Sequence, residues 1–199
     1  MKVENPEEER EREEKEELDD KIYLNTSLYL NIMFLLLLLG ICGCFSQTVP
    51  ELNITKYLGY WYQVYGAPTN VLFQGYGKCI TAQYGLEQGL DGNITVINSQ
   101  LNRTNGLEQI RGYAYSGAEP GKLVVHLDGV PVDSPYWIIK LGDSLEQYTY
   151  SIITVPSGIS LWVLARNVEE FYEKYDDEVK EFLTDFRYVP ISQTNCEYF

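Results

Sequence analysis

The stretch of sequence that decides the fold reads Tyr57-Leu58-Gly59-Tyr60-Trp61-Tyr62-Gln63-Val64-Tyr65. Gly59 allows a tight bend, and the aromatic residues after it favour a strand. Much later in the chain, a second strand ends in Arg166, whose guanidinium can lie flat on the indole of Trp61. We therefore expect Gly59, Trp61 and Arg166 to form a structural signature that closes one end of a small barrel.

Short alternating segments continue along the chain and are separated by Gly, Asn, Asp and Pro, which is typical of an all-β meander. We expect strands at residues 58–66, 79–86, 93–101, 107–116, 121–127, 135–141, 147–155 and 160–166. Eight such strands can close into an antiparallel up-and-down β-barrel, a calyx that holds one small ligand. The predicted fold class is therefore all-β.

One C-terminal α-helix is expected after the last strand and should pack on the barrel wall. Asn167 is a good N-cap, and Glu170 three residues later resembles a capping box. The apolar residues that recur at helical spacing on one face are Val168, Phe171, Tyr172, Tyr175, Val179, Phe182, Leu183 and Phe186.

Several segments together resemble the lipocalin family, most closely the branch of apolipoprotein D and the bacterial outer-membrane lipocalins. They are residues 56–62, 77–84, 135–139, 161–167 and 194–196, in the family's order. The resemblance implies binding and transport of a small hydrophobic ligand such as a fatty acid, lysolipid, retinoid or sterol-like molecule.

One lipocalin signature is altered in this sequence. The family usually has Thr-Asp-Tyr before its seventh strand, whereas residues 141–148 keep Asp143 without an adjacent tyrosine. The turn at the closed end is therefore expected to be built differently.

The residues expected to line the ligand site lie on the inner face of the barrel. Trp162 and Leu164 share the face of Arg166, because strand residues two apart point the same way. Tyr84 and Asn98 occupy places where related carriers have cavity residues. A buried asparagine would need a partner, which a ligand, a tyrosine hydroxyl or water could supply.

A long loop, residues 66–77, joins the first two strands and contains Phe73. In lipocalins this loop folds over the open mouth, where an apolar side chain can touch a lipid. Contact of Phe73 with ligand and simple packing beneath the loop both remain open.

The formal net charge of −14 is partly concentrated at the N-terminus, where residues 1–21 hold eleven acidic and five basic side chains. Such a run cannot bury enough surface to order itself, so we expect a disordered segment. Residues 22–47 form a hydrophobic signal peptide or membrane anchor, and residues 48–199 form the lipocalin domain. The acidity argues against nucleic acid or anionic membrane as a partner, and we expect a monomer.

Three interpretations of the hydrophobic segment stay open. A cleaved signal peptide, possible with a start at Met33, would give a secreted protein. An uncleaved segment, residues 28–45, would anchor the protein in a membrane. A bacterial type of cleavage site before Cys44 would allow a lipid anchor there.

Two cysteines, Cys79 and Cys196, remain in the domain behind the leader, and an even count in that setting indicates a disulfide. The lipocalin resemblance implies the same pairing. Asn53, Asn93 and Asn102 begin Asn-x-Thr sequons, which predict glycosylation on surface turns of a secreted protein.

No pattern indicates catalysis, a metal site or a cofactor. His126 is the single histidine and lies in an apolar strand, where a surface role is favoured. One alternative function is lipid isomerisation of the prostaglandin-synthase type, which needs Cys79 as a free thiolate. A second alternative is a structural or interaction barrel filled by its own side chains.

Overall fold

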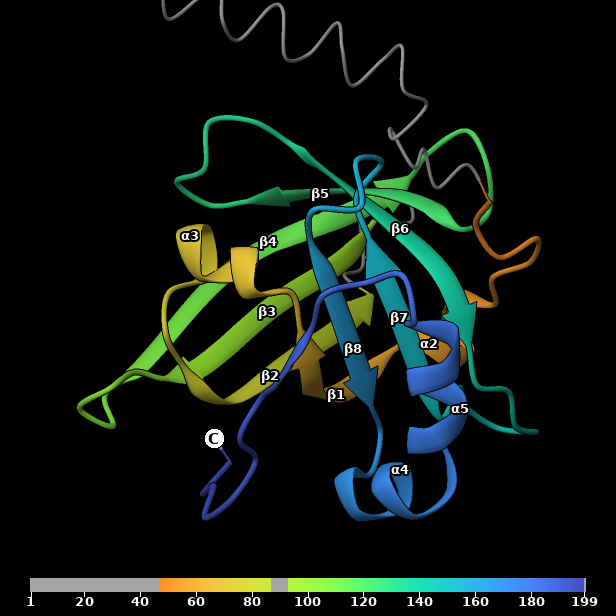
Figure 1. The fold of residues 1–199 in the computed structure, drawn as a ribbon. Coiled ribbons are helices and arrows are strands. Elements are labelled where there is room, and N and C mark those ends of the chain that lie inside the picture. The colour runs from red at the N-terminus through yellow and green to blue at the C-terminus, as the bar shows by residue number, and fades with distance from the viewer. Residues whose placement is uncertain (1–46, 87–92, 199) are drawn as a thin grey trace, which may run out of the picture. The chain divides into compact units, whose positions relative to one another are not determined.

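The structure, a computed structural model, describes residues 47–86 and 93–198. Within these residues, antiparallel strands curl into a barrel (Figure 1). Its eight strands are β1 Gly59–Gly66, β2 Lys78–Leu86, β3 Ile94–Leu101, β4 Leu107–Ser116, β5 Lys122–Leu127, β6 Ser134–Leu141, β7 Tyr150–Thr154 and β8 Leu161–Ala165. Strands adjacent in the chain pair in order, and β1 pairs with both β8 and β2. These pairings close the barrel, so the predicted fold class is confirmed.

Short elements decorate this barrel. Helix α2, Ile54–Tyr57, precedes β1, and the long loop after β1 contains the 3₁₀ turn η1, Pro68–Asn70, and helix α3, Val71–Gln74. A two-residue strand β9, Val189–Pro190, pairs with the end of β1. The sequence patterns did not predict these elements, because each is shorter than the period that a pattern needs.

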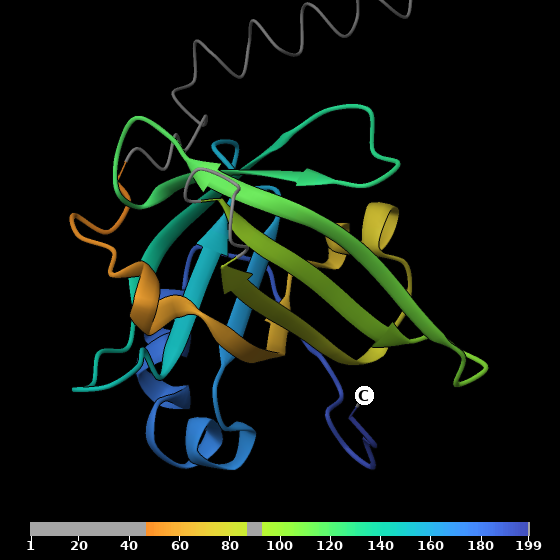
Figure 2. The same cartoon turned by 180° about the vertical axis from the view of Figure 1, so that it is seen from behind.

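The barrel separates two apolar clusters, since successive strand residues point to opposite faces. The inner cluster includes Trp61, Ala82 and Leu164. The outer cluster places the other face of β1, β7 and β8 against helices α4, Val168–Lys174, and α5, Asp176–Phe182. Figures 1 and 2 show these two helices beside β7 and β8, with α3 on the opposite side of the molecule.

The predicted C-terminal helical segment is present, but it is interrupted at Tyr175. The Asn167 cap is confirmed, because its Oδ1 accepts a hydrogen bond of 3.0 Å from the Glu170 amide. Tyr175 has φ −119° and ψ −14°, and its ring packs 5.5 Å from the Tyr150 ring. Two residues of the predicted apolar face, Tyr172 and Phe182, are 42% and 38% exposed and so are not buried against the barrel wall.

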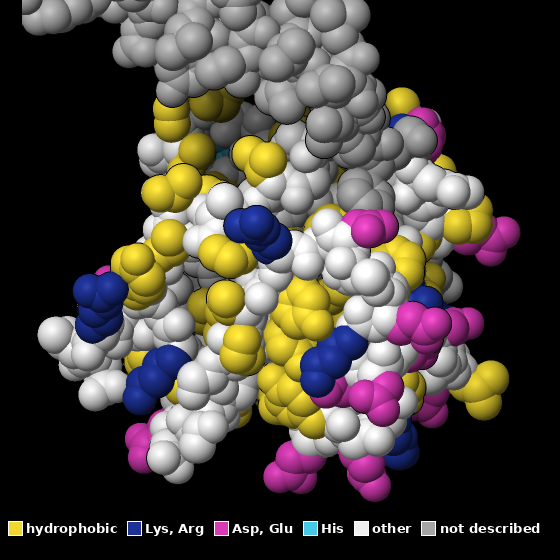
Figure 3. Space-filling model, viewed as in Figure 1, with side chains coloured by type: hydrophobic (Ala, Val, Ile, Leu, Met, Phe, Trp, Pro, Cys, Tyr) yellow, Lys and Arg dark blue, Asp and Glu magenta, His cyan; other side chains and the backbone are white. Residues whose placement is uncertain are grey.

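Charge is unevenly spread over the described surface. Figure 3 shows acidic side chains gathered over the lower side that carries α4 and α5, whereas hydrophobic side chains predominate around α3. No helix among the described residues is long and apolar enough to cross a membrane. The predicted acidic segment, residues 1–21, and residues 22–46 of the predicted leader lie outside the described residues.

Candidate functional site: the interior of the barrel

The closed end of the barrel is built on Trp61 and Arg166. The guanidinium of Arg166 lies 3.7 Å from the centroid of the Trp61 ring, as predicted. The indole Nε1 donates to the Tyr57 carbonyl at 2.8 Å. Burial lowers the pKa of Arg166 to about 10, which leaves it charged at neutral pH.

Arg166 also joins the strands to the segment before β1 through backbone carbonyls. Its Nη1 donates to Tyr60 O at 2.6 Å, its Nη2 to Leu58 O at 2.7 Å and to Lys56 O and Tyr57 O at 3.0 Å, and its Nε to Tyr148 O at 3.3 Å. Every guanidinium nitrogen is therefore engaged at the closed end.

A chain of four hydroxyl groups lies above this floor. The Tyr57 hydroxyl is 2.9 Å from Ser151 Oγ and 2.8 Å from the Tyr136 hydroxyl, which is 2.9 Å from the Tyr84 hydroxyl. Burial raises the pKa of Tyr57 to about 12 and raises those of Tyr84 and Tyr136 further. These phenols stay neutral, so the deep interior carries polar groups without charge.

The register places four of the predicted site residues inside the barrel. Leu164 pairs with Ser151, and Trp162 pairs with Ile153, in positions that face inward with Trp61. Asn98 pairs with Ala82, and Tyr84 belongs to the same inner cluster. Tyr57 and Tyr136 were not predicted as site residues, although alternation from Ile138 would have placed Tyr136 inward.

Several inward positions at or above the hydroxyl chain keep part of their surface accessible. They are Asn98, Ile110, Leu127, Tyr136 and Trp162, all half-buried. Their neighbours on the inner face include the small residues Ala82, Val96 and Ala114. The accessible part of each of these side chains can be reached by a molecule the size of water.

The loop that carries α3 is fastened at the open mouth. The Phe73 ring lies 5.9 Å from the Trp162 ring and is 62% exposed. Gln74 Nε2 donates to Gln63 Oε1 at 2.9 Å, while Trp162 Nε1 donates to Gln74 Oε1 at 3.2 Å. Gln100 Nε2 donates to the Gln74 carbonyl at 2.8 Å. The loop therefore acts as a partial cover, held by amides that the sequence patterns did not single out.

The sequence of this chain matches the family model of the lipocalin-like domain over residues 52–185, which includes β1 to β8. The chain belongs to the lipocalin family. Lipocalins bind small hydrophobic ligands inside their barrels.

Relatives of this lipocalin occur in distant organisms. It is 33% identical over 130 residues to apolipoprotein D of Mus musculus, a match that covers 62% of this chain and 66% of that protein. It is 30% identical over 145 residues to temperature-induced lipocalin-1 of Arabidopsis thaliana, with 68% and 74% covered. Identity to the outer membrane lipoprotein Blc of Vibrio cholerae is 30% over 123 residues, with 60% and 68% covered.

Solved structures share the fold of this lipocalin at lower identity. Apocrustacyanin C1 superimposes with a TM-score of 0.52 at 18% identity, over 73% of this chain and 83% of that one. The cockroach allergen Per a 4 gives a TM-score of 0.53 at 20% identity, over 76% and 95%. These likenesses concern the fold.

The closed-end turn of this lipocalin uses Asp143 without the usual tyrosine beside it. Lys56 Nζ donates to Asp143 Oδ1 at 3.0 Å and to the Ser144 carbonyl at 2.7 Å. Tyr148, five residues after Asp143, accepts a hydrogen bond of 2.9 Å from the Asn53 amide through its hydroxyl. The departure seen in the sequence thus corresponds to a turn held by α2.

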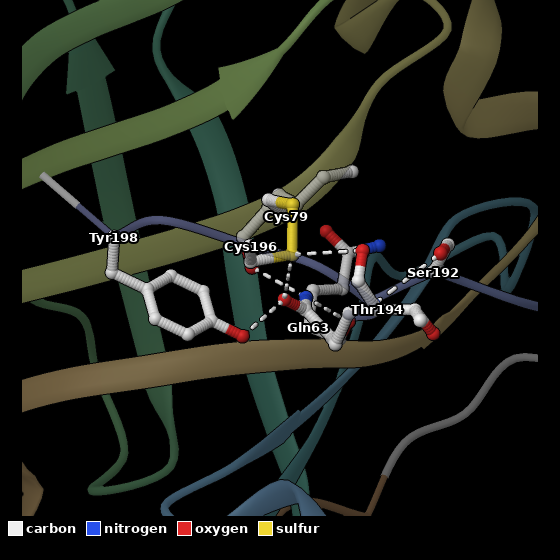
Figure 4. The surroundings of a disulfide bond; sticks show 8 residues. Gln63, Cys79, Ser192, Thr194, Cys196 and Tyr198 are labelled. Atoms are coloured by element: carbon white, nitrogen blue, oxygen red, sulfur yellow. Dashed lines mark hydrogen bonds between the residues drawn. A yellow bond between two sulfur atoms is a disulfide. The ribbon is translucent and has the colours of Figure 1, made fainter.

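The predicted disulfide joins Cys79 at the start of β2 to Cys196 in the C-terminal tail of the lipocalin (Figure 4). Gln193, beside the bridge, donates to Gln63 O at 2.8 Å and to Ile80 O at 2.9 Å. The tail is therefore held against both β1 and β2. With its sulfur bonded, Cys79 has no thiolate to act as a nucleophile.

His126 lies on the outer face of β5. Its Nδ1 is 2.8 Å from Asp133 Oδ1, and its ring stacks on Tyr113 with centroids 4.8 Å apart. No group of three or more potential metal ligands occurs within the described parts of the chain. The surface role expected for His126 agrees with this position.

The predicted sequons differ in their surroundings. Asn53 is exposed and caps α2 through Oδ1, which accepts from the Lys56 amide at 3.2 Å. Asn93 is half-buried, and Asn102 Nδ2 donates to Glu108 Oε1 at 2.9 Å. A glycan on Asn102 would attach to the nitrogen that donates to Glu108, whereas one on Asn53 would leave the capping oxygen in place.

Proposed function

We propose that this lipocalin binds and carries one small hydrophobic molecule, such as a fatty acid, lysolipid, retinoid or sterol-like compound, without chemical change. The observation that carries the proposal is the set of inward residues that stay half-buried above the hydroxyl chain, including Asn98, Ile110 and Trp162. A barrel filled by its own side chains up to the mouth would leave less of these positions accessible. The ligand-free alternative is therefore disfavoured.

Removal of apolar surface from water supplies the affinity. Each buried methylene is worth about 0.8 kcal/mol, so a dozen give a gross term of about 10 kcal/mol. Association and ordering reduce this value substantially, and micromolar to submicromolar dissociation constants are expected.

In this proposal Trp162 and Leu164 form one wall of the site, and Asn98 faces it from β3. Tyr84 belongs to its lower boundary, and Phe73 covers part of the mouth. The side-chain amide of Asn98 has no hydrogen-bond partner among the described residues, so it is available to a ligand or to water.

The isomerase alternative requires a free thiol at Cys79. Its sulfur is bonded to Cys196, and reduction of that bond would be needed before any thiolate could react. We therefore favour a carrier that works without a cofactor. Mass mapping of non-reduced peptides tests this assignment, since a free Cys79 would reopen the enzymatic function.

Displacement of a fluorescent fatty acid from the purified protein tests the carrier function. Trp162→Ala should weaken every ligand, because it removes a wall of the site. Trp137→Ala is the matched control, since Trp137 faces outward beneath Lys122, whose Nζ lies 4.7 Å from the ring centroid. Unchanged affinity in a folded Trp162→Ala protein would refute the site. Failure of fatty acids, retinoids and sterols to bind would refute the carrier function.

For location, we propose a secreted monomer with glycans on its sequons. Anchoring through residues 28–45 or through a lipid on Cys44 is the alternative. The bacterial relative is named an outer membrane lipoprotein, whereas the predicted disulfide and sequons favour secretion. The intact mass and N-terminal sequence of the mature protein distinguish a cleaved leader from a retained or lipid-modified one.

A further inference from the structure

The four linked hydroxyls of Tyr84, Tyr136, Tyr57 and Ser151 contain one more proton than their mutual hydrogen bonds use. Three contacts of 2.8–2.9 Å join the four groups in a row. Each hydroxyl supplies one proton and can accept twice. Whichever way the bonds run, one O–H has no acceptor within the row.

The unused proton can lie where the interior is accessible. Ser151 and Tyr57 are 0% and 1% exposed, whereas Tyr84 is 6% exposed and Tyr136 is half-buried. An unsatisfied donor costs least where another molecule can reach it. The row is therefore poised to offer a hydrogen bond from Tyr136 or Tyr84 to whatever occupies the space above.

The described interior offers no positive charge to a ligand. The basic strand residues pair with outward positions of the neighbouring strands; they are Lys78, Arg111, Lys122 and Lys140. The guanidinium nitrogens of Arg166 donate to backbone carbonyls at the closed end, next to the Trp61 ring. A carboxylate drawn into this interior would lose water without gaining a cation, which is strongly unfavourable.

The open end carries charges of both signs. Lys78 pairs with Leu101 there, and Arg103, in the turn between β3 and β4, lies 4.0 Å from the centroid of the Tyr76 ring. Glu108 pairs with Gln100 at the open end, and hydrogen bonds from Asn102 and Gln100 hold the pKa of its carboxyl below the usual range. Deep in the barrel, burial raises the pKa of Tyr57 to about 12, so the phenols act as donors and never as anions near neutral pH. The neutral phenols therefore give an anionic ligand no compensating positive charge deep in the barrel.

We propose that the preferred ligand is a neutral lipid that carries an alcohol or carbonyl oxygen, bound with this oxygen against Tyr136 and Tyr84. Its apolar body extends towards Trp162 at the mouth. The inference rests on the proposed carrier function and selects, among its ligands, sterols and retinol-like molecules over ionised fatty acids.

Matched ligands at pH 8 test the inference with the full-length protein. The pairs are retinol with retinoic acid, hexadecanol with palmitic acid, and cholesterol with cholestane. The alcohols should bind at least about tenfold more tightly than the ionised acids, because the acids lose hydration without a counter-charge. Cholesterol should exceed cholestane by about three- to tenfold, the value of one hydrogen bond.

The double variant Tyr84→Phe/Tyr136→Phe removes the accessible donors. This variant should bind cholesterol no more tightly than cholestane. Its affinity for cholestane should equal that of the parent, which also shows that the variant is folded. Tyr113→Phe/Tyr115→Phe on the outer face of β4 is the matched control, since Tyr115 donates to Asp133 rather than to the interior. If the double variant does not fold, Tyr136→Phe alone should lower cholesterol binding selectively.

Two results would overturn the inference while the carrier function stands. One is equal binding of alcohols and acids by the parent protein. The other is an unchanged preference for cholesterol in a folded variant. If none of the six compounds binds, the inference fails together with the proposed function.

Discussion

Replacement of Arg166 by methionine tests how far the closed end supports the barrel. Methionine keeps much of the length of the side chain but removes the charge that lies 3.7 Å from the Trp61 centroid. A partly desolvated cation–π contact is worth about 2 kcal/mol. The backbone carbonyls that accept from the three guanidinium nitrogens also lose their donors, at a net cost of about 1 kcal/mol for each nitrogen removed.

The variant no longer pays the cost of burying a charge, which offsets part of that sum. The expected decrease in the free energy of unfolding is therefore about 4 kcal/mol. For a domain of this size the thermal midpoint should fall by roughly 10 °C, measured by calorimetry or by circular dichroism. Arg111→Met, on the exposed outer face of β4, should stay within about 0.5 kcal/mol of the parent. A loss at Arg166 no larger than that of this control would show that the floor holds without the cation.

Three further changes probe the bridge, the buried phenols and the loop. Cys79→Ser/Cys196→Ser should lower the free energy of unfolding by up to about 4–5 kcal/mol, because the bridge spans 117 residues, and reduction of the parent should reproduce the shift in denaturant midpoint. The free energy of unfolding should fall as the pH rises from 10 to 12. Tyr57 keeps its proton up to about pH 12 in the folded protein, whereas the same tyrosine in the unfolded chain releases it near pH 10. Arg166, whose pKa is lowered, has the opposite effect on stability in this pH range, but several buried tyrosines outweigh it. Tyr57→Phe should therefore make stability fall less steeply with pH, and the same slope in variant and parent would contradict this origin. Gln74→Ala should speed release of a bound fluorescent lipid in stopped-flow measurements by releasing α3 from Gln63 and Trp162, and an unchanged rate would mean that the loop does not retain ligand.

Much of the barrel was predictable because strands and turns leave local patterns. The predicted strand at residues 107–116 coincides with β4, and most other predicted strands differ by one residue at an end. The seventh strand is shorter, Tyr150–Thr154, because the chain from Gly142 to Thr149 forms the turn held by α2. The contact between Trp61 and Arg166 was also predictable, since both flank strands that must meet when a barrel closes.

The hydroxyl chain and the amides at the mouth were beyond local patterns. Alternation can place Tyr136 on the inner face, but no local pattern shows that its hydroxyl meets those of Tyr57 and Tyr84, which come from other parts of the chain. Gln74 and Gln63 meet only because the loop folds back over the mouth. The interruption at Tyr175 depends on the Tyr150 ring beneath it, which no helical periodicity contains.

The position of the closing contacts along the chain has a consequence for biosynthesis. Arg166 contacts carbonyls 106 to 110 residues earlier, and Cys196 pairs with a cysteine 117 residues earlier. A ribosome that has made β1 to β7 has therefore produced neither the residue that seals the floor nor the one that ties down the tail. Until β8 emerges, one edge of β1 lacks its partner, and until Cys196 emerges Cys79 is an unprotected thiol. The nascent barrel is thus most vulnerable to mispairing and aggregation just before β8 is made. Substitutions that slow the pairing of β8 should reduce yield more than they reduce the stability of the folded molecule.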